Sequence, residues 1–151
     1  MNIRIDDPKR PEVARLLREH LDSMALYSPP ESVHALDIQG SCKPDITLWS
    51  AWEGEALLGC CALKKLAGQH GEIKSMCTAK EHLRRGVAAR LLQHIIDEAV
   101  RRGYCHLSLE TGSDPAFAPA RALYARFGFS ECGPFNGYVE DPYSVYMTRP
   151  L

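Results

Sequence analysis

Two adjacent arginines and a group of small residues could bind an anion near the middle of this sequence. Arg84 and Arg85 directly precede Gly86, and Ala88 and Ala89 follow it closely. Positive charge beside a helix N-terminus is unfavourable by roughly 0.3–1 kcal/mol for each exposed residue, so a bound anion would offset that cost. No Ser, Thr, Asp or Asn stands in the four residues before Gly86 to cap the helix. The pattern therefore predicts a phosphate or pyrophosphate site.

The same stretch has a second interpretation, in which it binds nothing. Thr78 and Glu81 have the spacing of a capping box, so the helix could begin at Ala79. Gly86 would then lie inside the helix, at a cost of about 1 kcal/mol relative to alanine. The residue chemistry alone leaves both interpretations open.

Other motifs for phosphate binding or nucleophilic catalysis are missing from the sequence. It contains no G-x-x-x-x-G-K-[ST], no G-x-G-x-x-G and no G-x-S-x-G pattern. Cys77 and His82 could form a thiol nucleophile, although a cysteine within an apolar strand is usually a packing residue. A thiol-dependent hydrolase is therefore a minor alternative.

The expected secondary structure places the two arginines between a strand and a helix. Strands are predicted over Asn2–Ile5, Ile46–Trp52, Ala56–Leu66, Gly71–Thr78, Cys105–Leu109, Phe129–Cys132 and Ser144–Thr148. Helices are predicted from Pro11 to the turn at Tyr27–Pro30, over Val87–Arg102, and from about Pro119 to Gly128. Residues 31–44 have a mixed pattern and could hold one or two helical turns before a loop. The alternation of strands and helices over residues 71–127 requires a right-handed crossover and a parallel strand pair, which predicts a mixed α/β fold.

Composition and charge limit the classes of function. The chain has 151 residues, 45% of them hydrophobic and 25% charged, which predicts one folded domain over residues 1–151. A net charge of -1 provides no basic field for nucleic acid or an anionic membrane, so neither is an expected partner. The longest apolar runs are too short to span a membrane, and the N-terminus carries charges where a signal peptide would be apolar. We expect a cytoplasmic protein, either monomeric or a homodimer.

The six cysteines and the histidines lack the spacing of metal ligands. No C-x-x-C pair occurs, and His70, His82, His94 and His106 are scattered along the chain. Buried, reduced thiols and no metal site are therefore expected.

Three successive segments resemble motifs of the GNAT (GCN5-related) N-acetyltransferases. These segments are Gly71–Thr78, Leu83–Leu92 and Ala120–Phe129, and they match in order and spacing. Ser108–Ser113 and Phe135–Pro142 further resemble a branch of small bacterial N-acetyltransferases whose acceptors are seldom assigned. The resemblance implies a GNAT-like fold, with a central, mostly antiparallel, twisted sheet that has one parallel strand pair and flanking helices.

The resemblance also implies an activity, which is acetyl transfer from acetyl-CoA to a primary amine by direct attack. In such enzymes the strand that matches Met76, Cys77 and Thr78 pairs with the pantetheine arm through its backbone. The turn and helix start that match Arg84, Arg85, Gly86, Val87, Ala88 and Ala89 wrap the pyrophosphate. Tyr124 matches a tyrosine that protonates the departing thiolate, and Glu72 matches an acidic position that often acts as general base.

Two positions depart from the family pattern, and both catalytic candidates have ordinary structural alternatives. Leu83 replaces the usual Gln or Arg, and Phe117 replaces an Asn that often contacts the cofactor arm. Tyr124 also fits as a core aromatic residue, because it shares an apolar helix face. Glu72 could be a solvated strand residue, and the base could instead be Glu110, Asp141, His82 or His106.

Acceptor selection is expected from two loop-like segments, residues 27–34 and 135–143, which are rich in aromatic and hydrogen-bonding groups. Tyr27, His34, Asn136 and Tyr138 are the candidate acceptor-binding residues. The acceptor could be a small amine, an amino acid or a peptide N-terminus. A non-catalytic CoA-binding regulatory module on the same fold is the main alternative to an enzyme.

Overall fold

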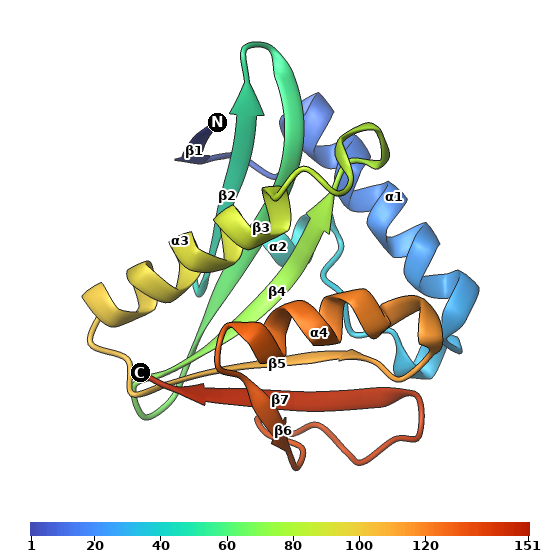
Figure 1. The fold of residues 1–151 in the computed structure, drawn as a ribbon, viewed down its shortest axis with the longest axis vertical. Coiled ribbons are helices and arrows are strands. Elements are labelled where there is room, and N and C mark those ends of the chain that lie inside the picture. Colours follow the sequence, from blue (N-terminus) through green and yellow to red (C-terminus); the bar gives the residue numbers. More distant parts are fainter.

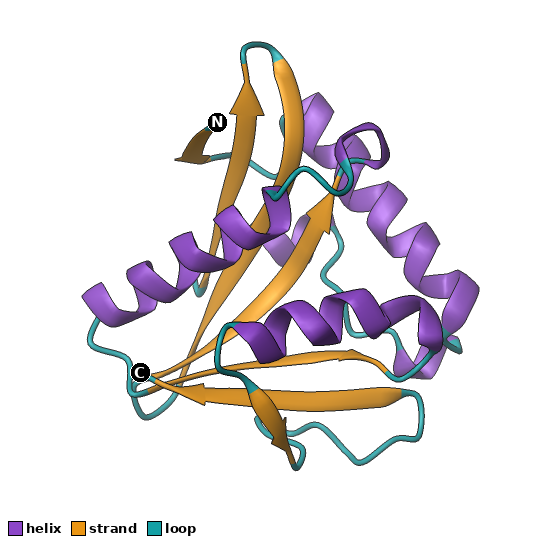
Figure 2. Cartoon of the chain, viewed as in Figure 1, coloured by secondary structure: helices purple, strands orange, loops and turns teal.

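A seven-stranded sheet forms the centre of the computed structural model, which describes residues 1–151 (Figures 1 and 2). The strand order is β1-β2-β3-β4-β5-β7-β6, and only β4 and β5 are parallel. The predicted sheet, mostly antiparallel with one parallel pair, is confirmed. The strands are β1 (Asn2–Ile5), β2 (Ile46–Glu53), β3 (Ala56–Leu66), β4 (His70–Thr78), β5 (His106–Gly112), β6 (Ser130–Cys132) and β7 (Ser144–Pro150).

Helices cover both faces of this sheet. The α-helices are α1 (Pro11–Tyr27), α2 (Ile38–Ser41), α3 (Val87–Arg101) and α4 (Ala118–Arg126), and 3₁₀ turns occupy Pro30–Ser32, Lys80–His82 and Pro115–Phe117. In β3, Cys61 and Leu63 pack in the same core cluster as α3, whereas Cys60 and Ala62 pack with α1. Successive strand residues point to opposite faces, so α3 and α1 lie on opposite sides of the sheet (Figure 1).

The parallel pair separates partway along its length. The ladder between β4 and β5 runs from His70 and His106 to Ile73 and Leu109, and beyond it the strands diverge (Figure 1). The β3–β4 register shifts between Cys60 and Ala62, and Ser75 of β4 has a φ of 52°. A bulge with a left-handed residue bends a strand locally, and such features recur beside functional sites. The separation therefore opens the sheet between its two central strands.

The helix that follows the two arginines begins later than a capping box requires. α3 starts at Val87, with Gly86 as its N-cap residue in the left-handed region at φ 79° and with no side-chain cap. The 3₁₀ turn over Lys80–His82 also has no side-chain cap, so Thr78 does not start a helix. The capping-box interpretation is therefore wrong, and the uncapped helix start is confirmed.

Other differences from the sequence-based expectations are local. β5 continues three residues past Leu109 to Gly112, because β7 pairs with its whole length. Residues 31–44 hold a 3₁₀ turn and the short helix α2. All six cysteines are free thiols, but Cys42 and Cys105 are exposed, so the expectation of buried thiols is wrong for these two. No helix has the length and apolar content that a membrane crossing requires.

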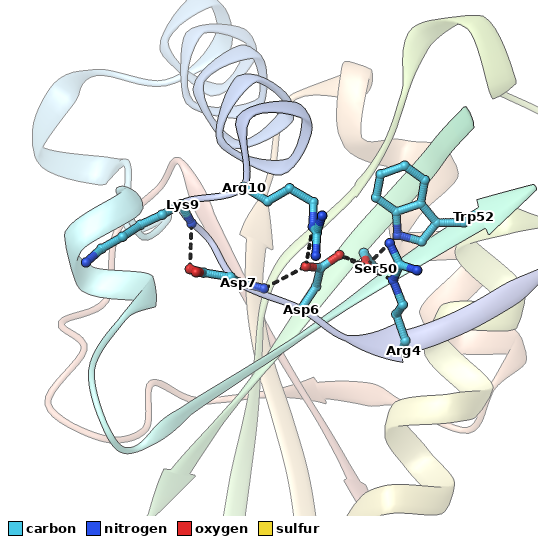
Figure 3. Close-up of polar contacts among 7 residues, drawn as sticks. All are labelled: Arg4, Asp6, Asp7, Lys9, Arg10, Ser50 and Trp52. Atoms are coloured by element: carbon cyan, nitrogen blue, oxygen red, sulfur yellow. Dashed lines mark hydrogen bonds and ion pairs between the residues drawn. The ribbon is translucent and has the colours of Figure 1, made fainter. Parts of the chain in front are cut away.

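A buried carboxylate joins the first strand to the first helix and the second strand (Figure 3). Asp6, whose side chain is 1% exposed, accepts hydrogen bonds from Ser50 Oγ at 2.5 Å and Arg10 Nε at 2.7 Å. Trp52 Nε1 donates to the same Ser50 Oγ at 2.7 Å. This chain of contacts fixes the edge strand β1 and the start of α1 against β2.

Candidate active site

A groove runs between the start of α3 and the face of α4. Its volume is about 540 Å³. Eight of the nine residues predicted to bind the cofactor line it: Met76, Cys77, Thr78, Arg84, Gly86, Val87, Ala88 and Ala89. The first-turn N–H groups of α3 lie at one end of the groove and have no side-chain cap, and Gly86, Ala88 and Ala89 at this helix start are small residues. The groove can therefore hold a long ligand that ends in phosphate groups.

The two predicted arginines differ in their surroundings. Arg85 donates to His82 Nδ1 at 2.7 Å and to Glu53 Oε1 at 3.3 Å, and it does not line the groove. Arg84 lines the groove, makes no ion pair within the protein, and has a φ of 61°. Arg84 is therefore a free cation at this site.

A third arginine was missed by the sequence analysis. Arg126 of α4 lines the same groove, on a helix face that also carries Leu123 and Ala120. The three- and four-residue spacing from Ala120 to Arg126 could have revealed it. Leu83, the first departure from the family pattern, also lines the groove, where its side chain is 57% exposed.

A narrow channel continues from the groove through the opening between β4 and β5. It has a volume of about 100 Å³, and it shares Met76, Ala120 and Tyr124 with the groove. Tyr124 packs in the main core cluster at 7% exposure, yet its ring reaches both spaces. Burial raises the pKa of Tyr124 well above its usual range, so the hydroxyl keeps its proton at neutral pH.

Glu72 is buried at 1% exposure in the channel wall, so its interpretation as a solvated residue is wrong. Tyr138 donates its hydroxyl to Glu72 Oε2 at 2.5 Å, and Lys74 Nζ lies 3.3 Å from the same oxygen. Lys74 also donates to the Tyr138 hydroxyl at 2.9 Å. The other carboxylate oxygen, Oε1, is buried with no hydrogen-bond partner. A buried, unpaired carboxylate oxygen is costly, which favours a ligand that brings a donor.

A second carboxylate lines the same channel. Glu110 is the first residue of β5 beyond the parallel ladder, as Lys74 is the first residue of β4 beyond it, and both line the channel. Burial raises the pKa of Glu110 to about 7, although the charge of Lys74 opposes this shift. A carboxyl group with a pKa near neutrality exchanges protons readily, which suits a general base. The sequence named Glu110 only as one of several substitutes for Glu72.

A wide cleft opens at the far end of the channel. Its volume is about 750 Å³, and it shares His34, Glu72, Lys74 and Tyr138 with the channel. Its wall consists of the residues around Ser32 and the segment from Asn136 to Tyr143, which are joined by a hydrogen bond from Ser32 to Asp141. His34 contacts the ring of Tyr138 edge-on, with ring centroids 5.0 Å apart. Three of the four predicted acceptor-binding residues thus lie together.

The fourth candidate, Tyr27, lies outside the cleft and the channel. It is 42% exposed, and its ring contacts Phe117 edge-on at a centroid distance of 5.8 Å. Phe117, the second departure from the family pattern, lines the channel and packs against Gly112, where any Cβ would overlap the ring. Tyr27 therefore supports a channel residue and does not line the acceptor cleft itself.

The residues of the thiol-nucleophile alternative are not brought together. Cys77 Sγ lies 3.2 Å from Cys60 Sγ on the neighbouring strand, and His82 is paired with Arg85. The contact with Cys77 and burial raise the pKa of Cys60 well above its usual range, which disfavours a thiolate there. His106 is exposed on β5, near His70. No group of three or more His, Cys, Asp or Glu side chains is placed to hold a metal ion.

Comparison with known proteins identifies relatives over the whole chain. The family model for the Acetyltransferase (GNAT) family matches residues 13–129, a range that includes every residue of the groove. YsnE of Bacillus subtilis strain 168, described as an uncharacterized N-acetyltransferase, is 59% identical over 151 residues, which cover 100% of both chains. YedL of Escherichia coli K12, with the same description, is 47% identical over 99% of this chain and 94% of its own. The crystal structure of an acyl-CoA N-acyltransferase from Klebsiella pneumoniae has a TM-score of 0.79 at 26% identity, covering 99% of this chain and 97% of that one.

Proposed function

The chain belongs to the GNAT family of acetyltransferases, and on this premise we propose that it transfers an acetyl group from acetyl-CoA to a primary amine of a small molecule, an amino acid or a peptide. The continuous path from groove to channel to cleft carries this proposal. A thioester that enters from the groove and an amine that enters from the cleft would meet beside Tyr124.

The groove suits acetyl-CoA in its chemistry. The pyrophosphate would accept hydrogen bonds from the backbone of Gly86, Val87 and Ala88 and would pair with Arg84, with Arg126 as a further cation. The pantetheine arm would lie along Met76–Thr78, where β4 has left β5 and its edge is free to pair. The acetyl group would then lie at the mouth of the channel.

The chemical step requires the amine to be neutral and the thiolate to leave. The amine nitrogen forms a bond to the acetyl carbon, the carbon–sulfur bond breaks, and the amine proton passes to a carboxylate. Tyr124 would donate its hydroxyl proton to the departing sulfur, since it lines both spaces and is protonated at neutral pH.

Two carboxylates are candidates for the base. Glu72, the residue matched by family resemblance, has one unpaired oxygen, but its other oxygen is held by Tyr138 and Lys74. Glu110 lies in the same channel and titrates near neutrality, so it can take up and release a proton more easily. We propose that one of these two carboxylates takes up the amine proton. Glu72 is the first candidate, and Glu110 is the alternative.

We further propose that the protein works in the cytoplasm, without nucleic acid, membrane or metal as a partner. Its six free thiols suit a reducing compartment, and its net charge of -1 provides no general attraction for polyanions. Every residue of the proposed site comes from one chain, so the proposed reaction is compatible with a monomer and with a homodimer.

The test is a panel of amines incubated with acetyl-CoA, with free thiol release followed over time and the acetylated product identified by mass spectrometry. We expect amine-dependent thiol release. A regulatory module would bind CoA in calorimetry and release no thiol with any acceptor. A thiol-dependent hydrolase would be indifferent to CoA and inactivated by a cysteine reagent.

A further inference from the structure

The inner floor of the acceptor cleft carries more positive than negative charge. Lys64 of β3 lies directly opposite Glu72 of β4 in the strand register, and Lys74 follows Glu72 on the same face. Lys64 lines the cleft and makes no ion pair within the protein, whereas Lys74 is paired with Glu72. Among the side chains that line this floor, two ammonium groups thus accompany one carboxylate; the second carboxylate near Lys74, that of Glu110, lies in the channel and not in the cleft.

The ammonium group of Lys74 also has unused hydrogen-bonding capacity. Its side chain is 9% exposed, and two of its three N–H donors are used, by Glu72 Oε2 and the Tyr138 hydroxyl. A buried cation with a free donor is stabilised by an additional acceptor, and an anionic acceptor gives the strongest bond. Lys74 lines both the cleft and the channel, so this acceptor would lie where the two spaces join.

The other negative side chains of the cleft, apart from Glu72, belong to its more exposed residues. Glu31 and Glu140 are exposed, and Asp141 accepts hydrogen bonds from Ser32 and from the backbone N–H of Tyr143. An anionic group would therefore be repelled by these more exposed side chains and attracted at the floor. A ligand with an anion at its reacting end and a polar or cationic remainder fits this distribution.

Taking the acetyl transfer proposed above as its basis, we propose that the acceptor is a free α-amino acid, held by its carboxylate at Lys64 and Lys74 with its amine in the channel. The amine and carboxylate of such a molecule share one carbon atom. With its carboxylate beside Lys74, such a molecule would therefore place its amine in the channel that Glu72 and Glu110 line. A peptide N-terminus has an amide in place of that carboxylate, and a simple amine has neither group.

The first experiment compares matched acceptors with acetyl-CoA. Each of the twenty L-amino acids is tested beside its carboxamide and its decarboxylated amine, each assayed at the pH that gives the same fraction of neutral amine. We expect the best amino acid to exceed both analogues in kcat/KM by about 10- to 100-fold, the effect of a charge-assisted contact. Equal or faster turnover of the carboxamide or the amine would overturn the amino-acid assignment and leave acetyl transfer intact.

The second experiment locates the carboxylate site. Lys64→Met should reduce the ratio of kcat/KM for the acid over the carboxamide toward one, mainly through KM. Lys65→Met, at the exposed neighbouring position of β3 on its opposite face, should keep the ratio of the parent protein. A ratio that is the same in both variants would place the carboxylate elsewhere and overturn the proposal.

A binding measurement separates this proposal from the proposed catalysis. Amino acids are titrated by calorimetry into the protein saturated with CoA, and the titration is repeated with Lys64→Met. If amino acids bind, this binding is lost in Lys64→Met and no turnover is seen, the result would support the amino-acid site and contradict acetyl transfer. If the protein binds CoA but binds no amino acid and shows no preference for amino acids over their carboxamides, the proposed amino-acid site is wrong.

Discussion

Ile73 of β4 and Leu109 of β5 are the last residue pair of the parallel ladder, and the sheet opens immediately beyond them. The next residues along each strand, Lys74 and Glu110, line the channel that connects groove and cleft. Under the proposed function, this single change in pairing would determine where the two substrates meet. The β4 bulge at Ser75 contributes, because a residue at φ 52° turns the strand away from its partner.

Arg84 and Arg85 are expected to contribute unequally to acetyl-CoA affinity. Arg84→Ala should weaken binding by about 10-fold or more, because it removes a free cation beside the uncapped helix start. Arg85→Ala should have a smaller effect, because its guanidinium is held by His82 and Glu53 away from the groove. Titration calorimetry with acetyl-CoA measures both.

Arg126→Ala tests whether the cation of α4 also faces the phosphate groups, and Arg90→Ala is a matched control on the exposed side of α3. An Arg84→Ala variant that keeps the parent's affinity would move the phosphate site away from this turn.

Tyr124→Phe should impair the chemical step alone. The variant keeps the ring and its packing in the core but removes the proton that the departing thiolate needs. We expect kcat to fall by about 10²–10⁴, with melting temperature and CoA affinity little changed. Unchanged turnover would make Tyr124 a core aromatic residue. If Tyr124→Phe loses both folding and turnover, the same assay is applied to the milder variant Leu123→Met. This variant perturbs the same helix but keeps the Tyr124 hydroxyl, so it shows how much turnover a perturbed helix alone removes.

Glu72 and Glu110 are distinguished by their pH profiles. Glu110 carries a pKa of about 7, so a reaction that uses it as base should rise with pH through about 7 and then level off. Glu110→Gln should remove that rise. If Glu72 only positions the amine, Glu72→Gln should lower turnover but keep the rise through about pH 7. If Glu72 is the base, Glu72→Gln should lower turnover by about 10²–10⁴ near neutral pH, and turnover should recover as pH increases and the free amine becomes abundant.

The same shift has a consequence for stability. An acid whose pKa is raised on folding favours the folded state fully below its unfolded pKa, here 4.5, and this contribution disappears as pH rises to about 7. Glu110→Gln should therefore lose less stability than the parent protein between these pH values. Urea unfolding at pH 5 and pH 8 measures the difference, and an equal loss in both proteins would show that Glu110 is not buried as described.

The sequence predicted the elements well because their signals are local. The helix pattern over Val87–Arg101 and the strand on either side of it depend on apolar spacing and on Gly103, and the uncapped start at Gly86 could be recognised from residue types alone. The groove residues followed from this local pattern together with the family motifs.

What the sequence could not show depends on contacts between distant residues. Glu72 and Tyr138 are 66 positions apart, and their hydrogen bond forms only because the β6–β7 segment folds over the start of β4. Arg85 differs from Arg84 because Arg85 pairs with Glu53, which lies in another strand. The importance of Glu110 depends on where β4 and β5 separate, and no local pattern specifies that point.

Asp6 is expected to stabilise the fold without taking part in the reaction. Its carboxylate accepts hydrogen bonds from Ser50, Arg10 and the Asp7 N–H (Figure 3). Asp6 follows the edge strand β1 and lines none of the groove, the channel and the cleft. Asp6→Ala should lower the free energy of unfolding by roughly 1.5–3 kcal/mol, because the Ser50 hydroxyl and the Trp52 N–H that donates to it lose their charged acceptor.

The pH dependence of the free energy of unfolding provides the control for the effect of Asp6→Ala. Burial alone would raise the pKa of Asp6, but the hydrogen bonds from Ser50 and Arg10 lower it to about 2. Its contribution should therefore be complete above the unfolded pKa of 3.8 and should disappear as pH falls toward 2. Asp7→Ala, which removes an exposed acceptor of the Lys9 N–H, should change stability much less. Urea unfolding at pH 7 and pH 2 distinguishes the two variants. A difference between parent and Asp6→Ala that is as large at pH 2 as at pH 7 would mean that packing, and not the carboxylate charge, is what the substitution removes.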